Sequence, residues 1–373
     1  MIDKTEAALS ALLNKIEPLD RDAMDAAEKR QSELAKPPGS FGKLEELSIR
    51  LAGITGKVNN HMDKRVLLVF AADNGVFEEG VSSCPQSVTM QQTINLTRGK
   101  TGAATLCAHY GIDLHVCDVG VNADILDPKV INRKIAYGTG NITKGPAMTR
   151  EQCVNAMMTG VEMVDTYCSD ADVVGVGEMG ICNTTTSAAV LASLLDLPAE
   201  CVTGKGSGAD MTTFLRKKEC VTRAIEINKP DANDAIDVVA KVGGFDIAAM
   251  AGAYIASAAR RIPAVIDGYI GVVAALVATR ICPAVRDYLV PSHASYEVGY
   301  RYAIDALELE PMLLLGMRLG EGSGCPIAMH ILDCACTIIN EMSDFASCEI
   351  DDGYLDDLRV GNSFDKEKFT VGE

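Results

Sequence analysis

From residue 65 onward, short and continuously apolar runs alternate with stretches of helical periodicity. The first run, 65–74 (RVLLVFAADN), ends in polar residues before Gly75, as expected for a strand buried on both faces. Further apolar runs occur at 114–119, 172–176 and 264–266, and helical stretches occur at 88–96, 102–110, 184–195 and 247–260. Strands that alternate with helices imply right-handed crossovers, so the pattern predicts an α/β fold with a doubly wound, mostly parallel sheet. Ligands of such sheets bind at the carboxyl ends of the strands.

The two ends of the chain differ from this middle part. Residues 1–60 contain apolar residues at helical spacing on both sides of an irregular loop, 36–42 (KPPGSFG). A further apolar helix is expected to begin near Pro326, and the acidic end from Asp344 is expected to be partly helical cover and partly a frayed tail. We therefore predict that residues 1–60 and 326–373 form a small helical domain beside an α/β domain at 61–325.

The net charge of the chain limits the kinds of partner that it is expected to bind. The formal net charge is −17, and phosphate backbones and anionic membranes need a positive surface. Nucleic acid and membrane are therefore excluded as expected partners. An anionic small substrate would have to be held locally, by backbone N–H groups and one or two cations.

The cysteines, histidines and apolar segments point to a cytoplasmic protein. The thirteen cysteines include no CxxC pair and lie mostly in apolar runs, as expected of reduced thiols that serve as small core residues. The five histidines show neither HxxxH nor HExxH spacing, so no metal site is predicted. The N-terminus lacks an apolar signal core, and the run 270–278 is too short to span a bilayer.

Two glycine-rich loops could bind a phosphate. In 175–186 (GVGEMGICNTTT), the glycines permit close backbone approach, and Asn183 or Thr184 could cap a following helix whose free N–H groups attract anions. The alternative for this loop is a tight turn. The loop 204–208 (GKGSG) precedes a helix with Lys217 and has neither Walker nor GxGxxG spacing. Its alternative is a flexible connection with a solvated lysine.

A third glycine-rich loop, 316–324 (GMRLGEGSG), carries a carboxylate between glycines. It follows an expected apolar strand at 312–315 and precedes the helix near Pro326. Partial burial would raise the pKa of Glu321 and make it a usable proton acceptor, and the alternative is a surface charge. Residues 292–295 (SHAS) offer hydroxyls at another expected strand end. No GxSxG sequence occurs, which argues against a Ser–His–Asp hydrolase.

Together these segments resemble the nicotinate-nucleotide–dimethylbenzimidazole phosphoribosyltransferase family. The resemblance runs in unbroken order from about residue 36 to residue 347. Its matching segments are 36–56, 71–81, 95–104, 174–195, 204–210, 242–270 and 284–324. It implies a Rossmann-like sheet with a small helical domain built from both chain ends, assembled as a homodimer, and makes residues 61–325 the nucleotide-binding catalytic domain.

The resemblance also implies a reaction. Ribose 5-phosphate moves from nicotinate mononucleotide to 5,6-dimethylbenzimidazole, giving α-ribazole 5′-phosphate and nicotinate, as in cobalamin lower-ligand synthesis. Nicotinate leaves readily because its ring nitrogen is cationic while bonded to ribose, so no metal or other cofactor is expected. By resemblance, the general base is Glu321. The implied substrate-binding residues are Lys217, Ser295, Gly180 and Gly320 for the phosphate, Glu178 near the ribose, and Leu319, Gln92 and Cys84 around the aromatic base.

Three positions depart from the family pattern and leave the acceptor open. Some relatives have serine facing the aromatic base where this chain has Cys84, many have histidine in place of Asn74, and Cys182 replaces a small residue. Because a thiol is a weaker hydrogen-bonding group, the acceptor could instead be phenol or p-cresol, with this chain as one subunit of a heterodimer. A third possibility is a non-catalytic partner chain, against which Glu321 argues.

Overall fold

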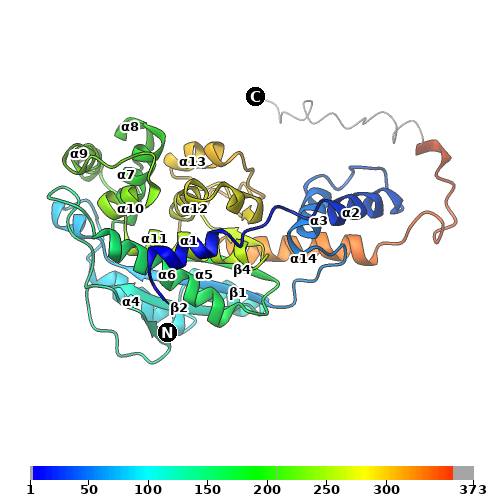
Figure 1. Cartoon of the computed structure of the whole chain (residues 1–373), viewed down its shortest axis with the longest axis horizontal. Coiled ribbons are helices and arrows are strands. Elements are labelled where there is room, and N and C mark those ends of the chain that lie inside the picture. Colours follow the sequence, from blue (N-terminus) through cyan, green and yellow to red (C-terminus); the bar gives the residue numbers. More distant parts are fainter. Residues whose placement is uncertain (1–2, 207, 356–373) are drawn as a thin grey trace. The chain divides into compact units, whose positions relative to one another are not determined.

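The strands form a parallel sheet with the doubly wound order. In the computed structural model (Figure 1), residues 3–206 and 208–355 are described. Six strands pair in parallel in the order β3-β2-β1-β4-β5-β6. Their bounds are β1 Arg65–Ala72, β2 Asp113–Gly120, β3 Val130–Asn132, β4 Val173–Met179, β5 Ala264–Ile266 and β6 Leu289–Pro291. The predicted fold class is confirmed. The short edge strand β3 was missed because three residues carry too little pattern to be recognised.

The two central strands are buried along their length. Every residue of β4 is buried, as is every residue of β1 after Arg65. Two glycines of β4 allow close packing above it: a Cβ on Gly175 would lie 2.7 Å from the Cβ of Cys325, and one on Gly177 would lie 2.6 Å from the Cα of Gly322. Part of the loop predicted at 175–186 is therefore strand, since Gly175 to Met179 belong to β4.

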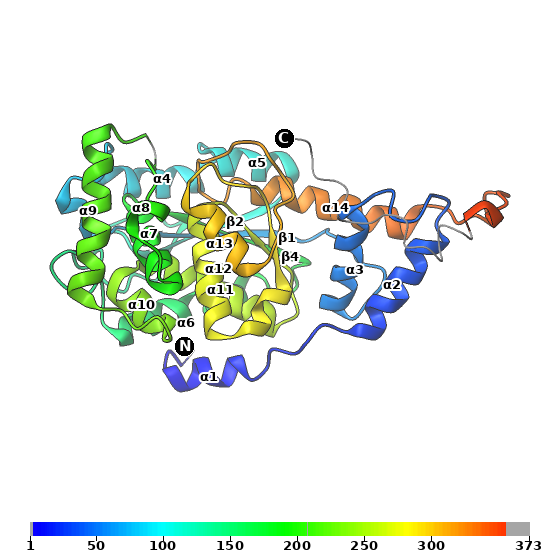
Figure 2. The ribbon, with the colours of Figure 1, turned by 90° about the horizontal axis from the view of Figure 1, so that it is seen from above.

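Helices cover both faces of the sheet. Figure 2 shows α4 and α5 on one side of the strands and α6 and α11 on the other. The helices of this α/β part are α4 Ser87–Thr97, α5 Gly102–Tyr110, α6 Arg150–Tyr167, α7 Asn183–Leu195, α8 Ala199–Val202, α9 Met211–Asn228, α10 Ala235–Val242, α11 Phe245–Ala259, α12 Tyr269–Ile281 and α13 Gly299–Leu307, with 3-10 turns at Gly75–Glu79 and Pro283–Tyr288. Among the described residues, no helix is both long enough and apolar enough to cross a membrane.

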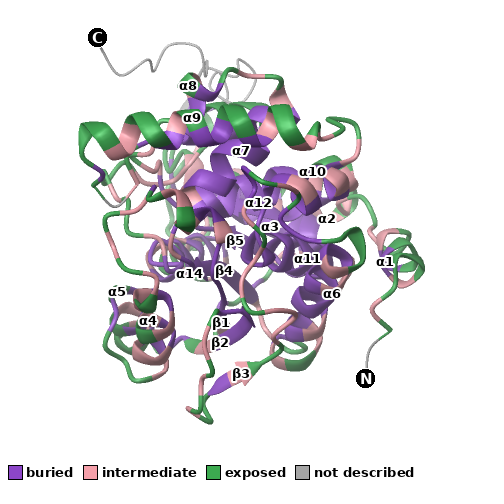
Figure 3. Ribbon diagram, turned by 90° about the vertical axis from the view of Figure 1, so that its left-hand side faces the viewer, coloured by how far each residue is buried: buried purple, intermediate pink, exposed green. Residues whose placement is uncertain are grey.

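Close helix contacts fix the core of this part. A Cβ on Gly160 of α6 would lie 1.9 Å from the carbonyl oxygen of Ala249, and one on Gly252 of α11 would lie 1.9 Å from that of Met157. The two glycines therefore let the α6 and α11 backbones touch. Figure 3 shows α7, α11 and α12 as largely buried.

The chain divides into two compact units. Of the described residues, the larger comprises those at 3–18, 63–206 and 208–329, and the smaller comprises those at 19–62 and 330–355. The smaller unit holds α2 (Arg21–Glu33), α3 (Lys43–Thr55) and most of α14 (Cys325–Glu341), which pack through Ala27, Ala52 and Ile339. A 3-10 turn at Gly353–Leu355 follows, and the rest of the acidic tail lies outside the described residues.

The first helix belongs with the larger unit. In α1 (Glu6–Leu13), Leu9 and Leu12 are buried, and the helix contacts α6 and α11. Lys4 Nζ donates to Thr159 Oγ1 at 2.8 Å. The predicted boundary assigned residues 1–60 as a whole to the small domain, whereas these contacts place α1 with the larger unit. Helical periodicity identified the element without showing which core it joins.

Candidate active site

A pocket of about 240 Å³ lies at the carboxyl ends of β4, β5 and β6. Its walls also include residues 81–84, Val88 and Gln92, which follow β1 along the chain. This is where the strand order reverses between β1 and β4, the position at which doubly wound sheets bind their ligands. All nine residues predicted from the sequence line this one pocket: Cys84, Gln92, Glu178, Gly180, Lys217, Ser295, Leu319, Gly320 and Glu321. Their placement together supports a common site.

Glu321 lies in a buried turn of unusual backbone. Gly320, Glu321 and Gly322 have φ angles of +83°, +63° and +79°. The glutamate is 5% exposed, and its Oε1 accepts a hydrogen bond from Gln92 Nε2 at 3.3 Å. Burial raises the pKa of its carboxyl group, an effect partly offset by hydrogen bonds from Ala103, Thr101 and Gln92. The alternative of a surface charge is wrong.

The segment before this turn is not the predicted strand. Of 312–315, Leu313 makes one parallel bridge with His293, whereas Leu314 and Leu315 are exposed. Apolar side chains on an exposed loop produced the strand-like pattern. Leu319 is 60% exposed, so it does not account for the burial of Glu321.

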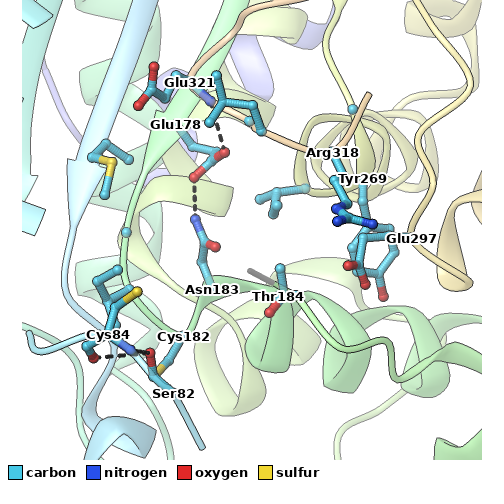
Figure 4. A pocket seen from close by; sticks show the side chains of 18 of the residues that line it. Ser82, Cys84, Glu178, Cys182, Asn183, Thr184, Tyr269, Glu297, Arg318 and Glu321 are labelled. Carbon is cyan, nitrogen blue, oxygen red and sulfur yellow. Dashed lines mark hydrogen bonds between the residues drawn. The ribbon is translucent and has the colours of Figure 1, made fainter. Parts of the chain in front are cut away.

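Glu178 lines the pocket and is linked through Asn183 to a second buried carboxyl group, that of Asp246. Asn183 Nδ2 donates to Glu178 Oε2 (Figure 4). It also donates to Asp246 Oδ2 at 3.1 Å. Burial and the neighbouring Asp246 raise the pKa of Glu178 to about 8. The carboxyl group is therefore largely protonated near neutral pH. The prediction that Asn183 or Thr184 caps α7 is wrong: Cys182 is the N-cap residue and no side chain caps the helix.

This pKa predicts how stability depends on pH. Because folding raises the pKa of Glu178 from about 4.5 to about 8, its favourable contribution is complete below the unfolded value and is lost as pH rises through the folded value. We expect the melting temperature of the wild type to fall by several degrees more than that of Glu178→Gln between pH 5 and pH 9. Thermal unfolding followed by circular dichroism measures this, with the exposed Glu151→Gln as control. Parallel curves for wild type and Glu178→Gln would contradict the pKa assignment.

Lys217 is the buried cation of the pocket. It is 2% exposed on α9, and its Nζ donates to Thr184 Oγ1 at 2.8 Å. A Cβ on Gly206 would lie 3.1 Å from the same Nζ, so the glycine loop passes directly over it. Burial lowers the pKa of Lys217, and the neighbouring Glu297 partly offsets this. The alternative of a solvated lysine is wrong.

A third group of pocket residues lies apart from Glu297 and Arg318. Figure 4 shows Ser82, Cys84 and Cys182 close together, on the side of the pocket away from Glu297 and Arg318. Ser82 Oγ donates to the carbonyl oxygen of Cys84 at 3.1 Å and accepts from the Cys84 N–H at 3.0 Å. The turn that presents Cys84 is thus fixed by a side chain within the pocket wall.

Comparisons with known proteins identify the family of the chain. A family model described as "Phosphoribosyltransferase" matches residues 16–350. The chain is 49% identical over 352 residues to the nicotinate-nucleotide–dimethylbenzimidazole phosphoribosyltransferase of Clostridium perfringens strain ATCC 13124, covering 94% of this chain and 98% of that one. It is 44% identical over 344 residues to the enzyme of the same name from Yersinia enterocolitica, covering 92% and 97%. The chain belongs to the nicotinate-nucleotide–dimethylbenzimidazole phosphoribosyltransferase family.

A solved structure from the phosphoribosyltransferase family has the same fold as this chain. The crystal structure of the enzyme of that name from Thermus thermophilus superposes with a TM-score of 0.85 at 36% identity, covering 90% of this chain and all of the other. A second crystal structure, of CobT from the same organism, gives the same TM-score over 89% of this chain.

Several residues of this phosphoribosyltransferase pocket were missed from the sequence. They are Asp267, His293, Glu297 and Arg318. Asp267 directly follows β5, so the rule that ligands bind at carboxyl strand ends could have identified it. Glu297 and Arg318 lie in irregular segments, where no periodicity marks them.

Proposed function

We propose that this chain transfers ribose 5-phosphate from nicotinate mononucleotide to 5,6-dimethylbenzimidazole, in the synthesis of the cobamide lower ligand. The observation that carries the proposal is one pocket with a buried lysine on α9 and a buried glutamate beside Gln92. The first suits a phosphate and the second suits a proton acceptor. Family membership supplies the substrate class.

The phosphate is bound by a few local groups despite the net charge of −17. Lys217 provides the cation, and Ser295 and the backbone N–H groups near Gly180 and Gly320 provide further donors. Glu178 faces the ribose. With a pKa of about 8 it is mostly a neutral acid at pH 7, so it can donate a hydrogen bond to a sugar hydroxyl and does not repel the phosphate.

The reaction needs one proton acceptor. The bond between the anomeric carbon and the nicotinate nitrogen breaks, and its electron pair returns to nicotinate, which leaves as a neutral ring. A nitrogen of the incoming azole bonds to the anomeric carbon, and the azole N–H proton passes to the carboxylate of Glu321. Gln92 holds that carboxylate by its hydrogen bond, and Leu319 and Cys84 contact the flat base. Alignment of the two reactants in the pocket supplies much of the remaining acceleration.

A competition between aromatic bases tests which of them is the acceptor. The wild type is offered nicotinate mononucleotide with equal amounts of dimethylbenzimidazole, adenine and phenol, and products are identified by mass spectrometry. We expect α-ribazole 5′-phosphate to predominate. Since a hydroxyl forms stronger hydrogen bonds than a thiol, Cys84→Ser should raise kcat/KM for the azole by up to about fivefold, a difference of about 1 kcal/mol.

Three outcomes would change this assignment. A predominant phenol or p-cresol O-glycoside would favour the alternative acceptor, and a requirement for a second, similar chain would indicate a heterodimer. No product with any acceptor would favour a non-catalytic partner chain. We propose a homodimer, and we place the enzyme in the cytoplasm, where its thirteen cysteines stay reduced.

A further inference from the structure

The turn that carries Glu321 cannot be held by its own backbone preferences. Three consecutive residues have positive φ, and the middle one is not glycine. The left-handed region costs a residue with a side chain roughly 1–2 kcal/mol, so such a conformation persists only when its surroundings fix it. The contacts on either side of Glu321 therefore decide where its carboxylate lies.

One carboxylate holds the side of the turn that follows Glu321. Asp267 is 3% exposed and follows β5 directly. Its Oδ2 accepts from the Gly322 N–H at 3.1 Å, and its Oδ1 accepts from the Gly324 N–H at 2.8 Å. The two hydrogen bonds tie the turn to the carboxyl end of β5. On the other side, the Glu321 N–H donates to Glu178 Oε1 at 3.4 Å, a longer and weaker bond.

The environment of Asp267 keeps it in place. His293 Nδ1 lies 3.9 Å from Asp267 Oδ1 and 3.0 Å from Ser292 Oγ. Gly324 cannot be larger, because a Cβ there would lie 2.2 Å from His293 Nδ1. The titratable groups whose charges interact with Asp267 or Glu321 are Glu178 on β4, Tyr254 on α11, His293 after β6, Tyr300 on α13 and Cys325 on α14.

We propose that Asp267 is a positioning residue for the general base: by accepting the Gly322 and Gly324 N–H groups, it fixes the turn that places the Glu321 carboxylate against the acceptor. This inference rests on the proposed role of Glu321. It assigns to Asp267 no contact with the substrates during the reaction, only control of the group that takes the proton.

Two substitutions separate the effect of where the Asp267 carboxylate lies from the effect of its charge. Asp267→Asn removes the charge and one acceptor, and Asp267→Glu keeps the charge but displaces the carboxylate by one methylene. A misplacement of about 1 Å can cost roughly 100-fold in rate, so we expect kcat to fall by about that factor in both variants while KM for nicotinate mononucleotide changes less than about twofold.

The pH profile gives a readout that a merely structural role would not move. Glu321 accepts a proton only when ionised, so activity falls as pH falls through its pKa. Burial raises this pKa and the Asp267 charge raises it further. The acid limb of kcat/KM should therefore move to lower pH in Asp267→Asn and stay in place in Asp267→Glu.

Asp118 offers a matched control. It is 1% exposed at the end of β2, and its Oδ1 accepts from the Gly120 and Val121 N–H groups at 3.1 and 2.8 Å, but it does not line the pocket. Asp118→Asn is expected to lower the melting temperature without moving the acid limb.

Wild-type kcat in a folded Asp267 variant, or an acid limb that stays in place in Asp267→Asn, would overturn the inference. If Asp267→Asn does not fold, Asp267→Glu decides through kcat alone. Full activity of Glu321→Gln would instead overturn the proposed role of Glu321 as general base, on which the inference rests.

Discussion

Replacement of Glu321 by Gln is expected to lower kcat by roughly 100- to 10,000-fold, the range that general-base catalysis supplies. The amide has the size of the carboxylate and can still bond to Gln92, but it cannot take the azole proton at neutral pH. Affinity for nicotinate mononucleotide should change less than about twofold, because the proposed phosphate contacts come from other residues. Steady-state kinetics with dimethylbenzimidazole and titration calorimetry measure the two quantities.

Glu308→Gln is the matched control for this change. Glu308 also has a left-handed backbone, with a φ of +50°, but its side chain is exposed and pairs with Arg286. It should leave kcat unchanged. Loss of nucleotide binding with retained turnover in Glu321→Gln would refute the role of a base.

Replacement of Lys217 by Ala is expected to weaken nicotinate mononucleotide binding by roughly tenfold to 100-fold. A hydrogen bond to a charged group contributes about 1.5–3 kcal/mol, and the buried position of Lys217 protects this interaction from solvent screening. KM for the nucleotide should rise accordingly, with a smaller effect on kcat. Titration calorimetry with nicotinate mononucleotide measures the affinity directly.

The neighbouring lysine provides the control. Lys218 Nζ lies 4.4 Å from the centre of the Phe214 ring, and Lys218 does not line the pocket. Lys218→Ala should bind the nucleotide as the wild type does. Unchanged affinity in Lys217→Ala would mean that the phosphate binds elsewhere.

The sequence predicted the sheet because its central strands are buried on both faces. The run from Arg65 and the run from Asp172 are continuous and apolar for that reason, and they became the central pair β1 and β4. At the edges of the sheet, the apolar pattern of the sequence does not identify the strands. The three residues of β3 carry no readable pattern, and the apolar residues at 312–315 are an exposed loop.

The candidate site was accessible from the sequence only in part. Glycine-rich loops and the family resemblance led to Glu321 and Lys217, since both stand in distinctive motifs. The long-range contacts around Glu178 and Glu321 could not be found in this way. Asn183 binds Asp246 across 63 residues, and Asp267 binds Gly324 across 57, so only the fold brings these partners together.

The most direct test of this account is a crystal structure of the protein with nicotinate mononucleotide bound. We predict the phosphate beside Lys217 and the anomeric carbon facing the Glu321 carboxylate, with room for a flat ring between them. A mononucleotide bound with its sugar far from Glu321 would contradict the account.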